Sequence, residues 1–350
     1  MTVRRLVIAT TLLICLMFAT HAGAKTAPRS FYGVIPADDP TSTEIDRMGA
    51  GKVGTLRINF VWGAVQPTAG APFDWSHYDA IIGEAAKNGI RVLPTVYSSP
   101  AWAAAKTNYP PSKSHIGDFR TFVQAASARY GANGTFWSEN PGIPKLPVID
   151  WQFWNEANSP SFWFGKPNPK QYVSYLRVFS RGIKAGDPSA KVVLAGLFRT
   201  PRVRHGIPLD RFLPAIYKSK GAKGLFDAVA MHPYASTPPD ALQAVKETRQ
   251  IMSRYKDKRT PLWITEVGWA TGGNPPTALV VSPQRQAKFL RQTYNLLAAK
   301  RGKYKIGGVI WYSWRDINGG IWFQHTGLFT AAFDPKPAWS AFTSLTGGTP

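Results

Sequence analysis

The chain has 350 residues, which suits one large α/β domain, and it carries a formal net charge of +22. A basic balance can indicate nucleic acid or acidic polymers, but lysine and arginine are scattered here, and 13 tryptophans are unusual for a nucleic-acid binder. We interpret the charge as a solvated basic surface, with an anionic glycan as the weaker alternative, and we expect no nucleic-acid binding.

The N-terminus has the order of a secretory signal. Two arginines precede an apolar run over residues 6–19, and the small residues Ala22-Gly23-Ala24 follow it. We therefore predict a signal peptide over residues 1–24 and a secreted mature chain without stable membrane insertion. An uncleaved N-terminal anchor is the competing interpretation. Since the only cysteine, Cys15, lies in this segment, we expect neither disulfides nor thiolate metal sites in the mature chain.

Apolar, strand-like runs recur along the rest of the chain, and segments between several of them have helical spacing. The predicted strands are Phe31–Ile35, Val53–Phe60, Ile90–Val96, Val148–Trp154, Val192–Leu197, Phe226–His232, Leu262–Val267 and Ile306–Trp311. Such alternation is typical of a parallel sheet covered on its outside. Because eight units follow one another without a Gly-rich phosphate-binding loop, we predict an α/β fold, a (β/α)8 TIM barrel, as one domain over residues 25–350.

Two intervening segments show the clearest helical pattern. Residues 78, 81, 82 and 85 share one apolar face, and so do residues 172, 175, 176, 179 and 183. The segments Ser98–Ile116 and Gly131–Pro147, rich in proline and other loop formers, are expected to be long loops.

Two glutamates occupy strand ends, where a barrel of this kind forms its functional site. Glu156 follows the fourth predicted strand, and Glu266 ends the seventh. Glycoside hydrolysis requires such a carboxyl pair, one member to protonate the leaving oxygen and the other to attack or to activate water. The alternative is that each glutamate is only a buried ion-pair partner of an arginine. Because both are flanked by apolar residues and tryptophans, we predict a catalytic pair.

The motifs around these glutamates resemble those of clan A glycoside hydrolases, closest to family 39 and its relatives, with family 5 next. Residues 154–158, Trp-Asn-Glu-Ala-Asn, resemble the strand-four motif, and residues 263–269, Trp-Ile-Thr-Glu-Val-Gly-Trp, look like the strand-seven motif. Further positions in register over the mature chain are Arg57, His232, Tyr234, Trp311 and residues 335–339.

The chain departs from the family pattern at two places. Ala157 stands where family members usually have proline. Tyr97-Ser98-Ser99 ends the third strand, where family 5 members often carry a histidine, and this favours the family 39 side.

The resemblance implies a role for each matching residue. Glu156 would be the general acid and later the base, and Glu266 the nucleophile of a retaining mechanism. Asn155 would bind the sugar 2-hydroxyl. His232 and Tyr234 would line the floor and orient Glu266, and Arg57 would lie near Glu266 and keep it ionised. The alternatives are a structural ion pair for Arg57 and a plain core residue for His232.

Tryptophans near predicted strand ends suggest an aromatic cleft with several sugar subsites, because aromatic rings cover the C–H faces of sugars. For any single one, an ordinary core position is an equal alternative. The candidates are Trp62, Trp102, Trp163, Trp269, Trp311, Trp314 and Trp322. The run Phe162-Trp163-Phe164 is the best candidate for one wall.

Together these features predict a secreted, monomeric, retaining β-glycosidase that acts on a poly- or oligosaccharide without a metal or organic cofactor. A carbohydrate-binding barrel without activity and a transglycosylase are the alternatives. The basic surface leaves both anionic and neutral glycans open as substrates.

Overall fold

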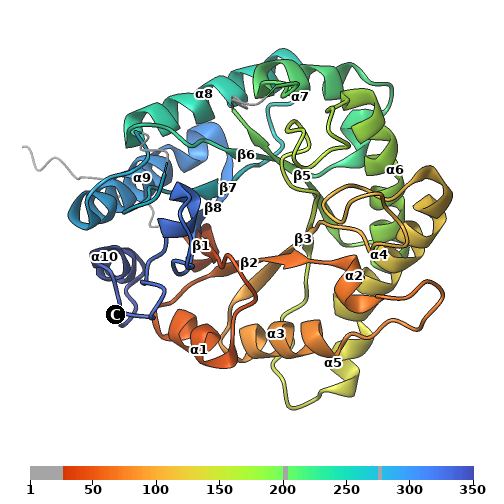
Figure 1. Cartoon of the computed structure of the whole chain (residues 1–350), viewed down its shortest axis with the longest axis horizontal. Coiled ribbons are helices and arrows are strands. Elements are labelled where there is room, and N and C mark those ends of the chain that lie inside the picture. The colour runs from red at the N-terminus through yellow and green to blue at the C-terminus, as the bar shows by residue number, and fades with distance from the viewer. Residues whose placement is uncertain (1–26, 200–203, 275–277) are drawn as a thin grey trace, which may run out of the picture.

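The computed structural model describes residues 27–199, 204–274 and 278–350 (Figure 1). The predicted signal peptide over residues 1–24 lies outside the described residues. None of the described helices combines the length and the apolar character that a membrane crossing requires.

Eight parallel strands form a closed barrel in which each strand pairs with the next in the chain and the eighth pairs with the first (Figure 1). They are β1 Tyr32–Ile35, β2 Thr55–Phe60, β3 Arg91–Val96, β4 Asp150–Phe153, β5 Lys191–Phe198, β6 Ala228–His232, β7 Leu262–Val267 and β8 Ile306–Tyr312. The prediction of a (β/α)8 barrel is confirmed, and every predicted strand is present with small shifts at its ends.

Helices surround the barrel on its outside (Figure 1). The α-helices are α1 Ser42–Ala50, α2 Trp62–Val65, α3 Ser76–Lys87, α4 Ile116–Tyr130, α5 Thr135–Glu139, α6 Pro169–Gly186, α7 Leu209–Lys218, α8 Pro238–Arg254, α9 Pro283–Tyr304 and α10 Pro337–Thr346. The 3₁₀ turns are η1 Arg29–Phe31, η2 Lys113–His115, η3 Ala222–Leu225 and η4 Trp322–His325. The apolar faces predicted for α3 and α6 are buried, whereas the loop expected over residues 131–147 contains the short helix α5.

Three long helices begin with the same local signal. The side chains of Asn168, Thr237 and Ser282 accept hydrogen bonds from backbone N–H groups of α6, α8 and α9, and a proline follows each cap. The cap satisfies a free N–H group, and proline needs no partner for its own nitrogen at the first helical position. These signals fix where the loops after β4, β6 and β7 end.

The core has two layers. The larger lies between the strands and the helices and holds outward-facing residues such as Trp151 and Phe153 of β4. The smaller lies inside the barrel and is closed by Leu93, Val193 and Ala230. Since successive strand residues point to opposite faces, Gln152 points inward between two outward aromatic residues. Above the small apolar floor, the barrel interior is therefore polar.

Candidate active site

Arg57 of β2 lies at the centre of the polar layer and is 1% exposed. Its Nη1 donates to Oε1 of Glu266 over 2.7 Å, and its Nη2 donates to Oδ1 of Asn155 over 3.0 Å. Its Nε donates to Thr95 and to Gln152, at 2.9 and 2.8 Å. A buried guanidinium requires both a counter-charge and acceptors for its donors, and strands β3, β4 and β7 supply them.

Several hydrogen-bond donors converge on the carboxylate of Glu266. Besides the ion pair with Arg57, its Oε2 accepts a hydrogen bond from the hydroxyl of Tyr234 over 2.9 Å. His232 Nδ1 lies 3.4 Å from the same Oε2. This carboxylate is held in one orientation by residues from β2, β6 and the loop after β6.

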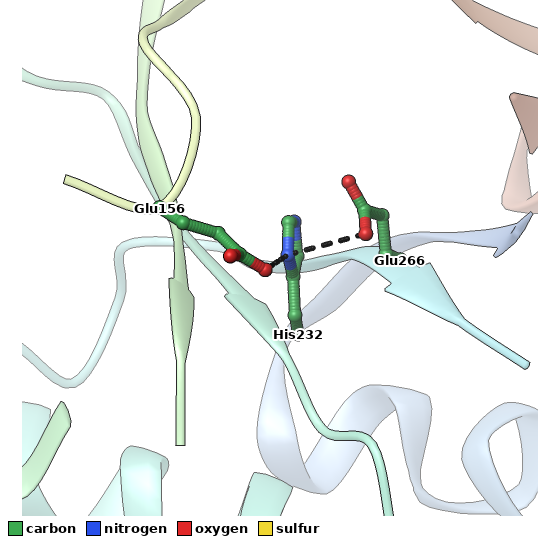
Figure 2. A group of neighbouring side chains, drawn as sticks. All are labelled: Glu156, His232 and Glu266. Atoms are coloured by element: carbon green, nitrogen blue, oxygen red, sulfur yellow. Dashed lines mark hydrogen bonds and ion pairs between the residues drawn. The ribbon is translucent and has the colours of Figure 1, made fainter. Parts of the chain in front are cut away.

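His232 of β6 stands between the two glutamates, as Figure 2 shows. Its Nδ1 lies 2.8 Å from Oε1 of Glu156, and its Nε2 lies 3.1 Å from the hydroxyl of Thr265. A Cβ at Gly196 of β5 would come within 1.9 Å of this ring, so only glycine fits there. The histidine is therefore clamped between β5, β7 and the Glu156 carboxyl.

The neighbouring amide of Gln152 constrains the hydrogen bonds of the His232 ring. The side-chain oxygen of Gln152 accepts hydrogen bonds from Arg57 and Thr95. The side-chain nitrogen of Gln152 is therefore a donor, and it donates to the hydroxyl of Thr265 over 3.3 Å. The hydroxyl hydrogen of Thr265 is then free to point at Nε2 of His232. Whether Nε2 accepts this hydrogen or the ring is charged, Nδ1 of His232 carries a hydrogen and donates it to Glu156.

The Glu156 backbone is held in an unusual conformation. Trp154 and Glu156 have φ angles of 67° and 37°, in the left-handed region that non-glycine residues rarely adopt. The buried Asn158 stabilises this turn, because its amide donates to the carbonyls of Phe198 and Ile207 at 2.7 and 2.9 Å. Left-handed conformations of this kind cost about 1–3 kcal/mol each and cluster at functional sites.

The two glutamates have opposite pKa shifts. Burial raises the pKa of Glu156, and the nearby Glu266 carboxylate raises it further, while the hydrogen bond and charge of His232 and the charge of Arg57 only partly oppose these effects. Burial alone would also raise the pKa of Glu266, but the charges of His232 and Arg57 and the hydrogen bonds from Arg57 and Tyr234 outweigh it. The pKa of Glu266 is therefore lowered, so Glu156 favours the acid and Glu266 the carboxylate.

The carboxyl groups are close to each other. One oxygen of Glu156, one of Glu266 and a ring nitrogen of His232 all lie within 4.8 Å of one another. Among the described residues this is the one group of three acidic or histidine side chains whose atoms converge closely enough to hold a metal ion. The three side chains already contact one another through a hydrogen bond and ion pairs. A metal ion would need the Nδ1 of His232 that donates to Glu156. The expected absence of a metal cofactor stays a prediction.

The glutamates open into a cleft of about 510 Å³ at the carboxyl ends of the strands. Its lining residues are Ile35, Pro36, Ala37, Asn59, Tyr97, Asn155, Glu156, Ser161, Phe162, Phe198, Tyr234, Glu266, Tyr312, Trp322 and Phe323. Phe162 forms part of a wall, as predicted from its run, whereas Trp163 and Phe164 do not line the cleft. Larger hollows lie among the outer helices and contain neither glutamate.

The interpretation of most tryptophans as cleft residues was wrong. Five of them are fully buried in the core and cannot stack against a sugar: Trp62, Trp163, Trp269, Trp311 and Trp314. Trp102 is half-buried and donates to the carbonyl of Gln66 over 3.1 Å, outside the cleft lining. Trp322 does line the cleft. Large aromatic rings satisfy a core as readily as a binding site, so composition could not separate the two.

Several cleft residues were missed, although their positions follow a simple rule. Tyr97 comes directly after β3, Phe198 ends β5 and Tyr312 ends β8. On β8 we predicted Trp311 as the cleft residue, but its neighbour Tyr312 lines the cleft. Neighbouring strand residues face opposite ways, so Tyr312 points inward where Trp311 points outward. Applying the strand-end rule to every strand would have found all three.

No family model and no curated protein sequence matches this chain. Among solved structures, it is similar to a family 39 glycoside hydrolase from Bacteroides cellulosilyticus, with 20% identity and a TM-score of 0.71 over 91% of this chain. It is also similar to a monomeric beta-xylosidase from Caulobacter crescentus, with 16% identity and a TM-score of 0.67 over 92% of this chain. The chain spans 63% of the first of these structures and 69% of the second.

A third similar structure is a family 5 glycoside hydrolase variant from Bifidobacterium longum in complex with Manβ1-4GlcNAc. It has 16% identity and a TM-score of 0.64, and the match covers 90% of this chain and 78% of that one. At these identities the likeness shows a shared fold, the (β/α)8 barrel of glycoside hydrolases in families 39 and 5.

The opposite pKa shifts predict opposite effects of two isosteric substitutions on stability. Because the pKa of Glu156 is raised, the native state retains a proton that the unfolded chain loses above about pH 4.3, so this residue costs stability as pH rises. Glu156→Gln should leave the free energy of unfolding at neutral pH unchanged or higher. Glu266→Gln should lower it by about 3 kcal/mol, since Arg57 stays buried without its counter-charge.

Urea denaturation of both variants and the unmodified protein at several pH values tests this. Equal destabilisation by the two substitutions at neutral pH would contradict the assigned environments.

Proposed function

We propose that this protein is a retaining β-glycosidase in which Glu266 is the nucleophile and Glu156 the acid/base. The observation that carries the proposal is the close carboxyl pair with opposite pKa shifts at the mouth of a barrel shared with glycoside hydrolases. Such a division of environments is how two carboxyl groups take separate acid and nucleophile roles.

In the first step the ionised Glu266 attacks the anomeric carbon while the bond to the leaving oxygen breaks. Glu156 donates its proton to that oxygen, so the leaving group departs neutral and a glycosyl ester forms on Glu266. In the second step Glu156, now a carboxylate, removes a proton from water as the water attacks the anomeric carbon. The ester bond breaks, Glu266 is again a carboxylate, and Glu156 is again protonated.

The distance between the carboxyl groups favours retention over inversion. The pair in retaining enzymes is about 5–5.5 Å apart, whereas inverting enzymes keep about 6.5–9.5 Å to accommodate a water molecule. One oxygen of Glu156 lies within 4.8 Å of one oxygen of Glu266, which is nearer to the spacing of a retaining pair than to that of an inverting pair.

The neighbouring residues support each stage. Arg57 and Tyr234 hold Glu266 ionised and oriented by hydrogen bonds to its two oxygens. Asn155, whose side-chain oxygen accepts from Arg57, keeps its amide N–H groups free to donate to a sugar hydroxyl near Glu266. His232 donates to Glu156 and steadies it when it becomes a carboxylate after the first proton transfer.

The cleft favours a neutral substrate. Although the chain carries a net charge of +22, none of the described residues that line the cleft is lysine or arginine. The one arginine beneath it, Arg57, is already paired with Glu266. We therefore propose a neutral glycoside in place of the anionic glycan that the overall charge left open.

The rim of the cleft favours an apolar or aromatic group on the leaving side. Ile321 and Phe323 are the exposed large hydrophobic residues among those the structure describes, at 46% and 40% exposure, and Phe323 lines the cleft. Between them, Trp322 packs edge-on against Tyr234, with ring centroids 5.5 Å apart. Exposed apolar residues gathered at a cleft mark a binding surface.

The predicted signal segment supports secretion as part of this proposal.

Alanine variants separate the two glutamate roles. After a panel of neutral β-glycosides identifies a substrate, Glu156→Ala should lower kcat/KM about 10²–10⁴-fold on an alkyl glycoside, whose leaving group needs a proton. The loss of kcat/KM in Glu156→Ala should be far smaller on a dinitrophenyl glycoside, whose leaving group departs without a proton. Added azide should accelerate this variant and yield a β-glycosyl azide, because azide needs no base.

Glu266→Ala should be inactive on both substrates, and azide should yield the α-glycosyl azide by direct displacement. A β-azide from Glu266→Ala, or full activity of either variant without azide, would overturn the assignment.

Removing the apolar rim tests the leaving-group side. Phe323→Ala combined with Ile321→Ala should lower kcat/KM about fivefold for an aryl glycoside, which corresponds to about 1 kcal/mol of lost apolar contact. A methyl glycoside of the same sugar, too small to reach the rim, is the matched control and should change less than twofold. Equal losses on both substrates would show that the rim acts on the site as a whole.

Preferred turnover of a glucuronide over the matching glucoside would contradict a neutral substrate.

A further inference from the structure

The loop after β8 contains a compact turn over residues 317–325, the rim turn, which carries part of the cleft wall. The backbone N–H of Ile317 donates to the carbonyl of Gln324 over 2.9 Å and closes this turn on itself. Within it, η4 contributes Trp322 and Phe323 to the lining of the cleft. Because the rim turn has internal hydrogen bonds of its own, its place over the cleft depends on how its two ends are held.

Both ends of the rim turn meet at the ammonium group of Lys336, a residue that precedes α10 and is 6% exposed. Its Nζ donates to the two carboxylate oxygens of Asp316, directly before the turn, at 3.0 Å each. The same Nζ donates to the carbonyl of His325, the last residue of the turn, over 3.3 Å. Asp316 also accepts a hydrogen bond from the backbone N–H of Gly327 over 2.7 Å. One buried ion pair therefore closes the base of the rim turn.

The same ammonium group fastens the rim turn to the loop after β7. Nζ of Lys336 donates to the hydroxyl of Thr271 over 2.9 Å, and the backbone N–H of Thr271 donates to the carbonyl of His325 over 2.9 Å. Further along this loop, the carbonyl of Asn274 accepts from the N–H of Trp322 over 3.1 Å. Since this loop leaves the strand that carries Glu266, the contacts fix the rim turn relative to that carboxylate.

A charged pair at this place is explained better by positioning than by stability. Two charges removed from water contribute little net stability, because desolvation offsets their attraction. Hydrogen bonds require defined distances and angles, so the pair holds the two loops in one arrangement. In that arrangement Trp322 packs edge-on against Tyr234, the residue whose hydroxyl donates to Glu266. A shift of the rim turn would therefore move the aromatic wall away from the cleft.

We propose that Lys336 and Asp316 are positioning residues that set the preference of the cleft for its leaving group. Neither residue is among those that line the cleft, so the pair acts through Trp322 and Phe323, which it holds at the rim. This inference rests on the proposed β-glycosidase function and on its apolar rim. Loss of the pair should weaken contacts with an aryl leaving group and leave the chemistry at the two glutamates unchanged.

The double variant Lys336→Met with Asp316→Asn removes both charges together, so that neither is left buried alone. We expect the ratio of kcat/KM for the aryl glycoside to that for the methyl glycoside to fall at least threefold, mainly through a higher KM for the aryl glycoside. The matched control is Arg129→Met with Asp79→Asn, which removes a partly buried ion pair between α4 and α3. That control should change the ratio less than twofold, even where it lowers stability.

Hydrogen–deuterium exchange measures the positioning itself, whether or not the protein turns over glycosides. Backbone amides of residues 317–328 should exchange at least tenfold faster in the double variant than in the unmodified protein, and at an unchanged rate in the control. Thr271→Val removes one acceptor of Lys336 without altering any charge, and it should lower the ratio about twofold. If the double variant does not fold, this milder variant decides the question in both assays.

The two assays separate the failure of this inference from the failure of the proposed function. An unmodified protein that hydrolyses neither glycoside would contradict the proposed function, and exchange would still decide whether the pair holds the rim turn. Unchanged exchange over residues 317–328 would overturn the inference. In an active enzyme, so would a fall of less than threefold in the ratio for the double variant, or an equal fall in the control.

Discussion

The buried ion pair between Arg57 and Glu266 is the constraint on which the rest of the site depends. A guanidinium that is 1% exposed cannot remain charged inside a barrel without a counter-charge and several acceptors. Glu266 supplies the charge, while Asn155, Thr95 and Gln152 supply the acceptors. Because these residues come from four strands, the closed barrel is needed to bring them together.

This network reaches Glu156 through shared residues. Gln152 accepts a hydrogen bond from Arg57 and donates one to the hydroxyl of Thr265. That hydroxyl forms a hydrogen bond with Nε2 of His232, and Nδ1 of the same ring forms one with Glu156. The result is one carboxylate surrounded by donors and a second carboxyl with a single strong donor and an apolar wall. Burial acts on both groups, but only Glu266 is compensated fully, which is why the two pKa values move apart.

The sequence predicted the fold and the centre of the site, but not the walls of the cleft. Parallel strands buried on both faces leave a strong apolar pattern, and the polar residues that end them, such as Glu266 and His232, stand out against it. Tryptophans carry no such contrast: Trp311 fills the core while its neighbour Tyr312 faces the cleft. The pairing of Arg57 with Glu266 joins residues 209 positions apart, and its geometry depends on the closed barrel.

The most direct test of this account is to trap the covalent intermediate. A 2-deoxy-2-fluoro glycoside with a dinitrophenyl leaving group slows both steps but lets the first proceed, so the glycosyl ester accumulates. Mass spectrometry of the intact chain and then of its peptides locates the sugar. The account predicts one sugar per chain, on the peptide that contains Glu266. A label on Glu156, or turnover without any covalent intermediate, would contradict it.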